Sequence, residues 1–585
     1  MKLTGGEIIA EYLIKEGIPY IVGIPGHGIL GLIDAFKGKE DKIKVIQVRH
    51  EQSAVHFADG YYRVTGKPLA VFTSIGPGAV NTAVGVATCY VDSTPVLLIT
   101  GETHTYMFGR GVLQEIERTH DANFPRMLEP VVKRWWQATA AEQLPEILEK
   151  AFNQMLSGRR GPVLISLPMD VQSESADVEI SKAKRRAENR FFGDPKDIDE
   201  AIGLLLKAKR PVILAGGGMI TSEASSELKE LAEFLQAAVI TTMMGKSSFP
   251  EDHPLYAWHT GSKGTSCGNK ISSTADVLLA VGCRFADLTT SSYRKGVSFS
   301  IPPTKLIHVD IDPGEIGKNY PVAVGIIGDA KSVMQQLIEK LKNSSKPLKR
   351  DSYVEEIQRL KDEWFQSLRE LRESNKVPMT ISRFLKELRE FLPRDGIVLT
   401  SAGHPQAQVL QELPLYAPRT LVTSGGFSTM GFVVPAALGV KLAAGERLVI
   451  GVIGDGDFLM TIQELATAVQ YNLPVVYAVL NNIGWISIRD LQLDMFGKER
   501  GISTEFFNRK GELYSPDFAA IAQAFGAYGE RIQKGEEVKP ALERAFASGK
   551  PVVIEVMVNR EYPYSAGKVA GQWDVPVPAY LKKSP

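Results

Sequence analysis

Short apolar runs alternate with longer amphipathic stretches along this chain, a pattern typical of α/β domains. In the first third, residues that favour β-strands gather at 20–26, 68–78, 95–102 and 161–168, and helical periodicity marks 5–17 and 143–156. Further strands are expected at 210–218, 237–244, 276–282 and 305–312, and in the last third at 447–457 and 474–482. Strands that alternate with helices predict parallel sheets covered on both faces.

Two polar, charged stretches divide this alternation into three parts. Residues 172–190 are interpreted as a linker, and residues 343–380 as a connecting segment with a solvated helix. The expected fold class is therefore α/β, with three doubly wound parallel-sheet domains. We predict these domains at 1–175, 190–342 and 376–565, followed by a C-terminal tail at 566–585.

The first and third parts share a layout that suggests an ancient duplication. Residues 74–101 and 424–456 each have a Ser- and Gly-rich turn, an Ala- and Val-rich helix, a short polar break and a buried strand. Two similar domains of this kind can face each other and share one ligand.

Composition narrows the classes of function. The 585 residues include 67 basic and 67 acidic side chains, so there is no overall charge bias toward nucleic acid. The apolar runs are much shorter than the ~20 residues that a membrane-spanning helix needs. The three cysteines are widely spaced, which fits a reducing cytoplasm better than a disulfide framework or a zinc site. We expect a cytoplasmic protein without nucleic-acid or membrane partners.

An acid in a glycine turn follows one expected strand, and an asparagine ends the next. Asp455 lies between Gly454 and Gly456, and Asn482 follows 27 residues later (482 − 455 = 27), which fits a strand–helix–strand unit. Their side-chain oxygens, a backbone carbonyl and phosphate oxygens would form the octahedral shell that suits Mg²⁺. The glycines let backbone N–H groups approach a diphosphate. A turn closed by an Asp cap explains the acid alone, and the asparagine at this distance favours the metal site.

Several motifs together resemble those of thiamine diphosphate (ThDP) enzymes, and of acetolactate synthases in particular. Residues 454–482 resemble the metal–diphosphate motif, 48–66 the helix with the cofactor-activating glutamate, and 423–439 the stretch before the diphosphate motif. The likeness extends to 157–172 and 282–290, and so covers nearly the whole chain. It implies pyrimidine-binding, central Rossmann-like and diphosphate-binding domains. It also implies a homodimer or homotetramer, with each active site between the first domain of one subunit and the third of another.

The resemblance gives three residues roles near the reacting centre. Glu51 matches the carboxylate that shares a proton with the pyrimidine ring of the cofactor, and we expect it to be buried in an apolar setting. Met430 matches the bulky side chain that bends the cofactor, and Gln114 matches a glutamine near the reacting carbons. Without the family, Glu51 could equally be a surface helix residue, Met430 core filler and Gln114 an ordinary surface residue.

Further positions are implied as contacts to cofactors. For ThDP they are Gly26, Pro77, Asn81, Gly403, His404, Gln406, Ser428, Gly454, Gly456 and Asp457, and for Mg²⁺ they are Asp455, Asn482 and the backbone at Gly484. In the middle domain the resemblance implies FAD, with Arg159, Gly217, Gly218, Arg284, Asp310 and Asp329 as contacts. Other family members keep this domain without flavin or with adenine nucleotides, and a glycine turn alone is weak evidence.

The sequence departs from acetolactate synthases around the expected path of the substrate. His27 stands where they usually have a glycine, Leu113 where they have a phenylalanine, and Met169 where they have a lysine. Elsewhere in the superfamily, pyruvate decarboxylases and a cyclic-diketone hydrolase use histidines near this place for proton transfer. A lone histidine is more often structural, but a glycine-rich turn at a cofactor edge favours a catalytic role for His27. These changes leave the cofactor assignment intact and the acceptor substrate open.

The favoured function is therefore decarboxylation of a 2-oxo acid such as pyruvate, with carboligation of the resulting enamine to a second carbonyl. The alternatives are a hydrolase or lyase that cleaves a C–C bond in a diketone or 2-hydroxy ketone, with His27 as acid and base, and a simple 2-oxo acid decarboxylase. A non-enzymatic homologue should have lost Glu51 or the metal ligands, and all of these are present.

Overall fold

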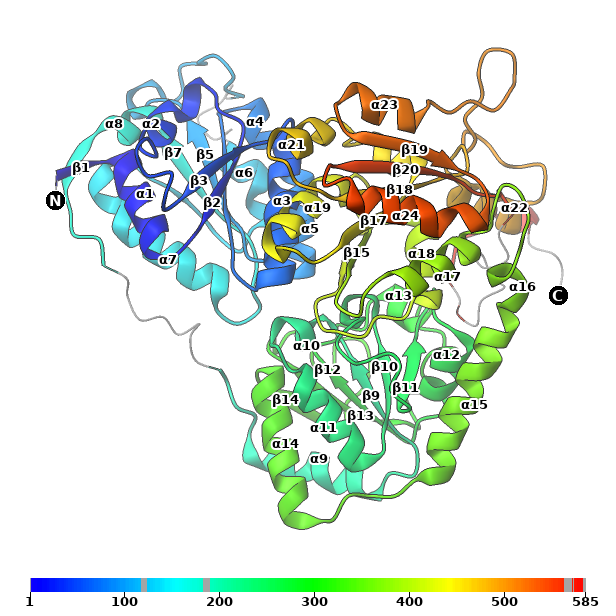
Figure 1. The fold of residues 1–585 in the computed structure, drawn as a ribbon. Coiled ribbons are helices and arrows are strands. Elements are labelled where there is room, and N and C mark those ends of the chain that lie inside the picture. The colour runs from blue at the N-terminus through cyan, green and yellow to red at the C-terminus, as the bar shows by residue number, and fades with distance from the viewer. Residues whose placement is uncertain (1, 117–123, 182–189, 562–570, 572, 582–585) are drawn as a thin grey trace. The chain divides into compact units, whose positions relative to one another are not determined.

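The protein contains three six-stranded parallel sheets with flanking helices, which confirms the expected α/β class (Figure 1). The structure is a computed structural model that describes residues 2–116, 124–181, 190–561, 571 and 573–581. In every sheet most residues of the middle strands are buried, and this explains why their sequences are nearly continuous apolar runs.

The first sheet has the strand order β3-β2-β4-β5-β7-β6. Its strands are β2 (Tyr20–Gly23), β3 (Lys44–Gln47), β4 (Ala70–Thr73), β5 (Leu97–Glu102), β6 (Trp135–Gln137) and β7 (Val163–Pro168). The main helices around it are α1 (Gly5–Lys15), α3 (Glu51–Thr65), α5 (Ala83–Asp92) and α7 (Leu144–Leu156), and a short helix, α4 (Pro77–Val80), follows β4. The first turn of α1 is closed by a capping box in which Thr4 and Glu7 satisfy each other's backbone N–H groups.

The central sheet has the order β11-β10-β9-β12-β13-β14. Counted from its first strand this is 3-2-1-4-5-6, the order of doubly wound nucleotide-binding domains. Its strands are β9 (Pro211–Ala215), β10 (Ala238–Thr241), β11 (Tyr256–His259), β12 (Val277–Val281), β13 (Lys305–Asp310) and β14 (Val324–Ile327). The helices used below are α9 (Pro195–Lys207), α10 (Gly217–Thr221), α12 (Ser266–Ser273) and α14 (Ala330–Ser344).

The third sheet has the order β16-β15-β17-β18-β20-β19, which is the order of the first sheet strand for strand. Its strands are β15 (Ile397–Thr400), β16 (Leu421–Thr423), β17 (Val449–Gly454), β18 (Val476–Asn481), β19 (Tyr528–Ile532) and β20 (Val552–Met557). The helices used below are α18 (Gly403–Glu412), α19 (Val433–Ala444), α20 (Asp455–Leu459), α21 (Glu464–Gln470) and α22 (Ile486–Phe496).

The shared strand order agrees with a duplication but corrects the pairing of its segments. Helix α5 lies between β4 and β5, whereas α19 lies between β16 and β17. In the common order, β16 corresponds to β3 and β17 to β4, so the counterpart of α19 is α3. The two stretches looked alike because both hold a glycine turn before a small-residue helix, which is a local pattern.

Contacts between residues divide the chain into two compact units. The first unit holds residues 1–189, 424–449 and 460–475, and the second holds 190–423, 450–459 and 476–585. Helices α19 and α21 thus belong to the first unit, although they connect strands of the third sheet. The domain limits expected at 175, 190, 342 and 376 stay predictions.

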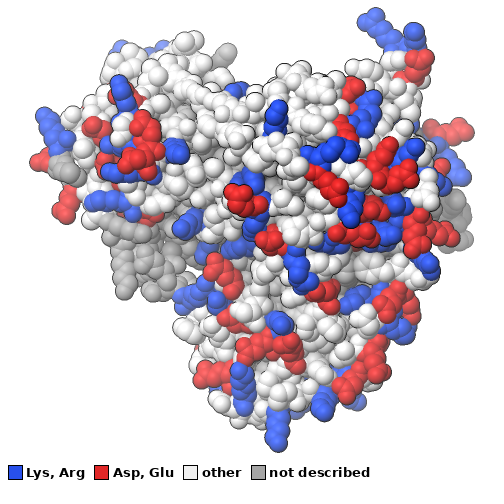
Figure 2. All heavy atoms as spheres, viewed as in Figure 1, with Lys and Arg blue, Asp and Glu red and all other residues white. Residues whose placement is uncertain are grey.

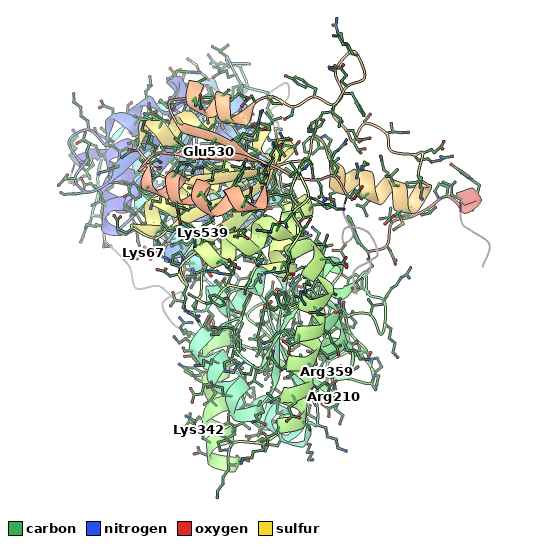
Figure 3. All side chains as sticks on the ribbon, turned by 45° about the vertical axis from the view of Figure 1, so that its right-hand side comes forward. Lys67, Arg210, Lys342, Arg359, Glu530 and Lys539 are labelled. Atoms are coloured by element: carbon green, nitrogen blue, oxygen red, sulfur yellow. The ribbon has the colours of Figure 1, made fainter. Side chains whose placement is uncertain are left out.

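Both expected connecting segments contain regular structure. Within 172–190, residues Ser175–Asp177 form β8, which pairs antiparallel with β1 (Lys2–Thr4). Within 343–380, the expected helix is α15 (Asp351–Ser367), and it buries Tyr353, Ile357 and Trp364 in the core of the central domain. Arg210, shown beside this helix in Figure 3, pairs with Glu356 at 2.6 Å.

Charged side chains of both signs are intermixed on the face shown in Figure 2. In the described part of the chain, none of the helices has the length and apolar character required to span a bilayer.

Candidate functional site

The first group of predicted residues lies at the carboxyl edge of the first sheet. Gly26 and His27 follow β2, Glu51 follows β3, Pro77 follows β4, and Gln114 lies in the long loop after β5. Ligands of open parallel sheets bind at this edge. All of these residues belong to the first unit, so their mutual contacts can be described directly.

Glu51 is the first residue of α3, and its carboxylate is held from α4 and the residue after it. The amide of Asn81 donates to Oε2 of Glu51 at 3.0 Å. A Cβ added to Gly78 would lie only 3.1 Å from Oε1, so this glycine makes room for the carboxylate. In the single chain Glu51 is half-buried, because the first turn of α3 lies at the sheet edge and outside the core; its burial beside the cofactor stays a prediction.

The turns that carry His27 and Gln114 are built around glycines. The N–H of Gly28 donates to Ser74 Oγ at 3.3 Å, and a Cβ on Gly26 would lie 2.6 Å from Ser74 Cβ. Gly76 has a φ of +61°, and its Cα faces the carbonyl of Gln114, whose own φ is +69°. The structure therefore brings the Gln114 loop against the turn before Pro77. His27, Pro77 and Gln114 are all exposed.

Met430 lies in a loop that is held in place by two hydrogen bonds. Asp92 Oδ1 accepts from the N–H of Gly426 at 2.8 Å, and the hydroxyls of Thr88 and Thr429 are 2.7 Å apart. Ser428, in the same loop, has a φ of +53°. The side chain of Met430 is 37% exposed, so it does not fill a core in the described chain. This exposure argues against the structural alternative and leaves the side chain accessible to a ligand.

The second group lies at the carboxyl edge of the third sheet, within the second unit. Asp455 directly follows β17 and Asn482 directly follows β18, as the sequence predicted. The N–H of Gly484 donates to Asp455 Oδ2 at 3.0 Å. Ile483 and Gly484 have φ angles of +60° and +153°, so the chain turns sharply behind the aspartate. The two ligands expected for the metal ion are therefore linked by one short turn.

Burial raises the pKa of Asp455 to about 6, although N–H groups of Gly484 and Gly456 act in the opposite direction. Asp455 is only 2% exposed, and the causes of its pKa shift within the described residues are burial and backbone N–H groups, with no cationic side chain among them. A buried carboxylate of this kind is costly unless a cation accompanies it. Mg²⁺ prefers carboxylate, amide and carbonyl oxygens, so Asp455, Asn482 and the backbone near Gly484 fit this ion. Across the described residues, no three His, Cys, Asp or Glu side chains are grouped around a metal position.

The structure separates the roles of the two neighbouring asparagines. Asn481 is fully buried, and its amide donates to Glu555 and to Ser515, each at 2.8 Å. Its Oδ1 accepts from the N–H of Ile483 at 3.1 Å. Asn481 therefore supports the turn, and Asn482 is the candidate metal ligand. Glu555, which the sequence analysis missed, has no local signal because it lies in the middle of an apolar strand.

Two residues predicted to contact the cofactor, Gln406 in α18 and Asp457 in α20, have hydrogen-bond partners within the protein. The amide of Gln406 donates to the carbonyl of Ser401 and to Thr423 Oγ1, and its Oε1 accepts from Lys263 Nζ at 3.1 Å. Asp457 accepts from the hydroxyl of Ser401. Both predicted residues are buried and make these hydrogen bonds within the protein, and their contacts to a cofactor stay predictions.

The glycines at the carboxyl edge of the third sheet have different structural roles. A Cβ on Gly456 would lie in the indole ring of Trp485, so packing requires a glycine there. At Gly403, whose φ is +76°, and at Gly454, the nearest atoms to an added Cβ are 3.8 and 3.9 Å away. Open space over these two residues suits the approach of a ligand to the backbone. His404 is 2% exposed, and burial, with help from Lys263 and Arg489, lowers its pKa to about 3.

The residues expected to hold FAD are only partly brought together. Gly217, Gly218, Arg284, Asp310 and Asp329 lie at the carboxyl ends of β9, β12, β13 and β14 in the second unit, whereas Arg159 lies in the first unit.

Several of these residues already have structural partners. Arg159 donates to Ser93 Oγ at 3.0 Å, and Gly218 packs against the backbone of Gly282. Asp329 caps α14 and also accepts from Arg190 at 2.9 Å and from Ser222 at 2.8 Å, so both of its oxygens are engaged. Asp310 also accepts from the N–H of Asp312 at 3.0 Å, and within the described residues no hydrogen bond of this kind involves the side chain of Arg284.

Comparison with known proteins gives matches along most of the chain. Residues 3–122 match the N-terminal TPP binding domain of thiamine pyrophosphate enzymes, 198–337 the central domain and 401–556 the C-terminal TPP binding domain. A probable acetolactate synthase large subunit of Methanocaldococcus jannaschii is 36% identical, over 95% of this chain and 92% of that protein. The acetolactate synthase isozyme 3 large subunit of Escherichia coli is 34% identical, over 95% of each chain.

Proposed function

The chain belongs to the family of thiamine pyrophosphate (ThDP) enzymes, and we propose that it decarboxylates a 2-oxo acid, pyruvate first of all, and joins the remaining acyl carbon to a second carbonyl. The names of its relatives support an acetolactate synthase-like reaction. The observation that carries the proposal is the buried Asp455, which has no cationic partner among the described residues and lies one turn from Asn482.

ThDP, when bound, supplies the carbanion chemistry that removes carbon dioxide and forms the new C–C bond. Mg²⁺ would be held by Asp455, Asn482 and the backbone near Gly484, and the diphosphate by the open backbone at Gly403 and Gly454. Glu51 would hold and move a proton at its Oε1 or Oε2, beside the pyrimidine ring. Asn81 keeps this carboxylate in place. Met430 would support the bend between the two cofactor rings.

The same residues would serve a reaction that cleaves a C–C bond, and this second candidate is kept because His27 stands where acetolactate synthases usually have a glycine. His27 is exposed in the turn after β2, so its imidazole is available to a substrate. In a carboligase it would donate a proton to the new alkoxide. In a hydrolase or lyase it would activate water or remove the proton of a hydroxyl.

Two further features belong to the proposal. The first is a homodimer or homotetramer in which active sites lie at a subunit interface. The second is FAD in the middle domain, held by Gly217, Arg284 and Asp310. The purified protein should then be yellow, with flavin absorbance near one per subunit, and a colourless protein that does not take up added FAD would rule the flavin out.

The experiment is product analysis by mass spectrometry, with pyruvate alone and then with a panel of aldehydes and diketones. Activity should disappear when Mg²⁺ and ThDP are removed and return when both are added. Asp455→Asn should fail to retain ThDP in equilibrium dialysis, whereas the control Asp494→Asn, at an exposed position of α22, should retain it. Normal retention by Asp455→Asn would contradict the metal site, and products from diketones but not from pyruvate would select the second candidate.

A further inference from the structure

Lys263 reaches from the central domain to the start of α18. It lies in the loop between β11 and α12, and its Nζ donates to Gln406 Oε1 at 3.1 Å. The loop itself is fixed, because the amide of Gln411 donates to the carbonyl of Lys263 at 3.0 Å. Asn269 bonds both the N–H and the carbonyl of Gly261, at 2.9 and 3.0 Å. The ammonium group is therefore held in one place by backbone and side-chain contacts.

The charge of Lys263 is not balanced inside the described chain. No described carboxylate forms an ion pair with it, and loss of hydration lowers its pKa to about 8. Lys246, in the loop after β10, is by contrast a lysine whose charge is balanced. It is fully buried and pairs with Glu251 at 2.6 Å. Lys263 is half-buried, and an ammonium group whose described partner is a neutral amide is less stable there than one in an ion pair. An anionic ligand would remove this penalty.

The other basic groups near Lys263 are either neutral or already paired with carboxylates. The pKa of the buried His404 is lowered by burial first and then by the charges of Lys263 and Arg489, so this imidazole is neutral. Arg489 is itself balanced by Asp490 at 2.9 Å and Glu505 at 3.7 Å. Among the described residues near the start of α18, Lys263 is thus a cation without an ion pair.

We propose that Lys263 is an anion-binding residue of the active site, and that Gln406 positions it rather than contacting the anion. Both N–H groups of the Gln406 amide are already used, by Ser401 and Thr423. An ammonium has three donors, and Gln406 takes one of them. The open backbone at Gly403, one helical turn before Gln406, leaves room for a ligand oxygen.

The ligand chemistry is an anionic oxygen, which could belong to the phosphate of the cofactor or to the carboxylate of the 2-oxo acid. This identification rests on the proposed function, whereas anion binding by Lys263 does not. Hydrogen bonds to charged groups are strong enough that losing one should weaken binding by about tenfold to a hundredfold.

The test compares Lys263→Met, which keeps the length of the side chain, with the conservative Lys263→Arg and the control Lys270→Met, an exposed lysine at the end of α12. The dissociation constants of inorganic pyrophosphate and of ThDP with Mg²⁺ are measured by calorimetry, and KM for pyruvate by steady-state kinetics. Weaker binding of pyrophosphate and ThDP would identify the phosphate, and a raised KM with unchanged ThDP binding would identify the carboxylate. Lys263→Arg should recover part of the loss, and Lys270→Met should match the parent.

Stability provides a readout that is independent of activity. Removal of an unbalanced charge should leave the melting temperature of the ligand-free Lys263→Met variant equal to or above that of the parent. Dissociation constants and KM all within twofold of the parent would overturn the proposal. A parent that binds pyrophosphate through Lys263 but forms no product from pyruvate would contradict the proposed function and leave the anion site standing.

Discussion

The crossing of α3 and α19 makes a strong prediction about Gly60. A Cβ added to Gly60 would lie 2.1 Å from the carbonyl oxygen of Ala436, and a Cβ added to Gly439 would lie 1.9 Å from that of Phe57. The two helices therefore touch backbone to backbone, within the first unit. Because α3 begins at Glu51, a shift of this helix also moves the carboxylate expected to activate the cofactor.

The size of the effect follows from the distances. An ordinary contact begins near 3.4 Å, so Gly60→Ala forces a separation of about 1.3 Å (3.4 − 2.1 = 1.3). Overpacking of this kind costs about 1–3 kcal/mol, and a rigid backbone contact belongs at the upper end of that range. The higher helix propensity of alanine stabilises the folded variant by about 1 kcal/mol. The net loss of about 2 kcal/mol should lower the melting temperature by about 4–8 °C.

The assay compares Gly60→Ala with Gly203→Ala. Gly203 lies within α9, and an added Cβ there meets no atom within 4 Å, so only the gain in helix propensity remains. Melting temperatures are measured by calorimetry, and amide exchange across α3 by mass spectrometry. Gly60→Ala should unfold earlier and exchange faster in α3, whereas Gly203→Ala should be at least as stable as the parent. Equal stability of the two variants would refute the reasoning from close helix contact.

Three further outcomes are expected. Glu51→Gln should bind ThDP as the parent does, but the exchange of the cofactor C2 proton, followed by NMR, should slow by about 10²–10⁴-fold; an unchanged rate would show that another group activates the cofactor. His27→Gly should keep ThDP binding and C2 exchange while changing the ratio of aldehyde, ligation and cleavage products, and identical ratios would make His27 a structural residue. Burial raises the pKa of Glu412 to about 7 from its ordinary value of 4.5, so its ionisation removes about 3 kcal/mol of stability as the pH rises through this range. Glu412→Gln should therefore melt above the parent at pH 8 and lose this advantage at pH 4, and a constant difference would contradict the shift.

The sequence located the middle strands of the first and central sheets but missed their edges. The strands that were not expected, β3, β6, β11 and β14, are the outermost strands of those two sheets. Middle strands are buried on both faces and therefore form continuous apolar runs. An edge strand can be short and can carry polar residues, as Lys44 and Gln47 do in β3. Such strands resemble loops when only the sequence is read.

Some residues of the candidate site could likewise be predicted from the sequence, and others could not. Asp455 and Asn482 could be predicted because each comes at the end of an apolar run, and strand ends in parallel sheets meet at one edge. The direction of a side chain cannot be read in this way, so Gln406 and Asp329 were expected to face a cofactor although their polar atoms are used inside the protein. Lys263 was missed because its partner lies 143 residues later in the chain.

The antiparallel pair of β1 and β8 has a consequence for engineering. Lys2 lies opposite Asp177 and Thr4 opposite Ser175, so the strands that enter and leave the first sheet domain run side by side. The 170 or so residues between them, about 5 to 174, form a cassette whose two ends lie side by side. The seam of this cassette is the β1–β8 strand pair. Such a cassette can be exchanged for that of a relative by joining the chains at a single place, or circularly permuted through a short linker. Chimeras made at this seam would transplant His27, Glu51 and Gln114 as one block.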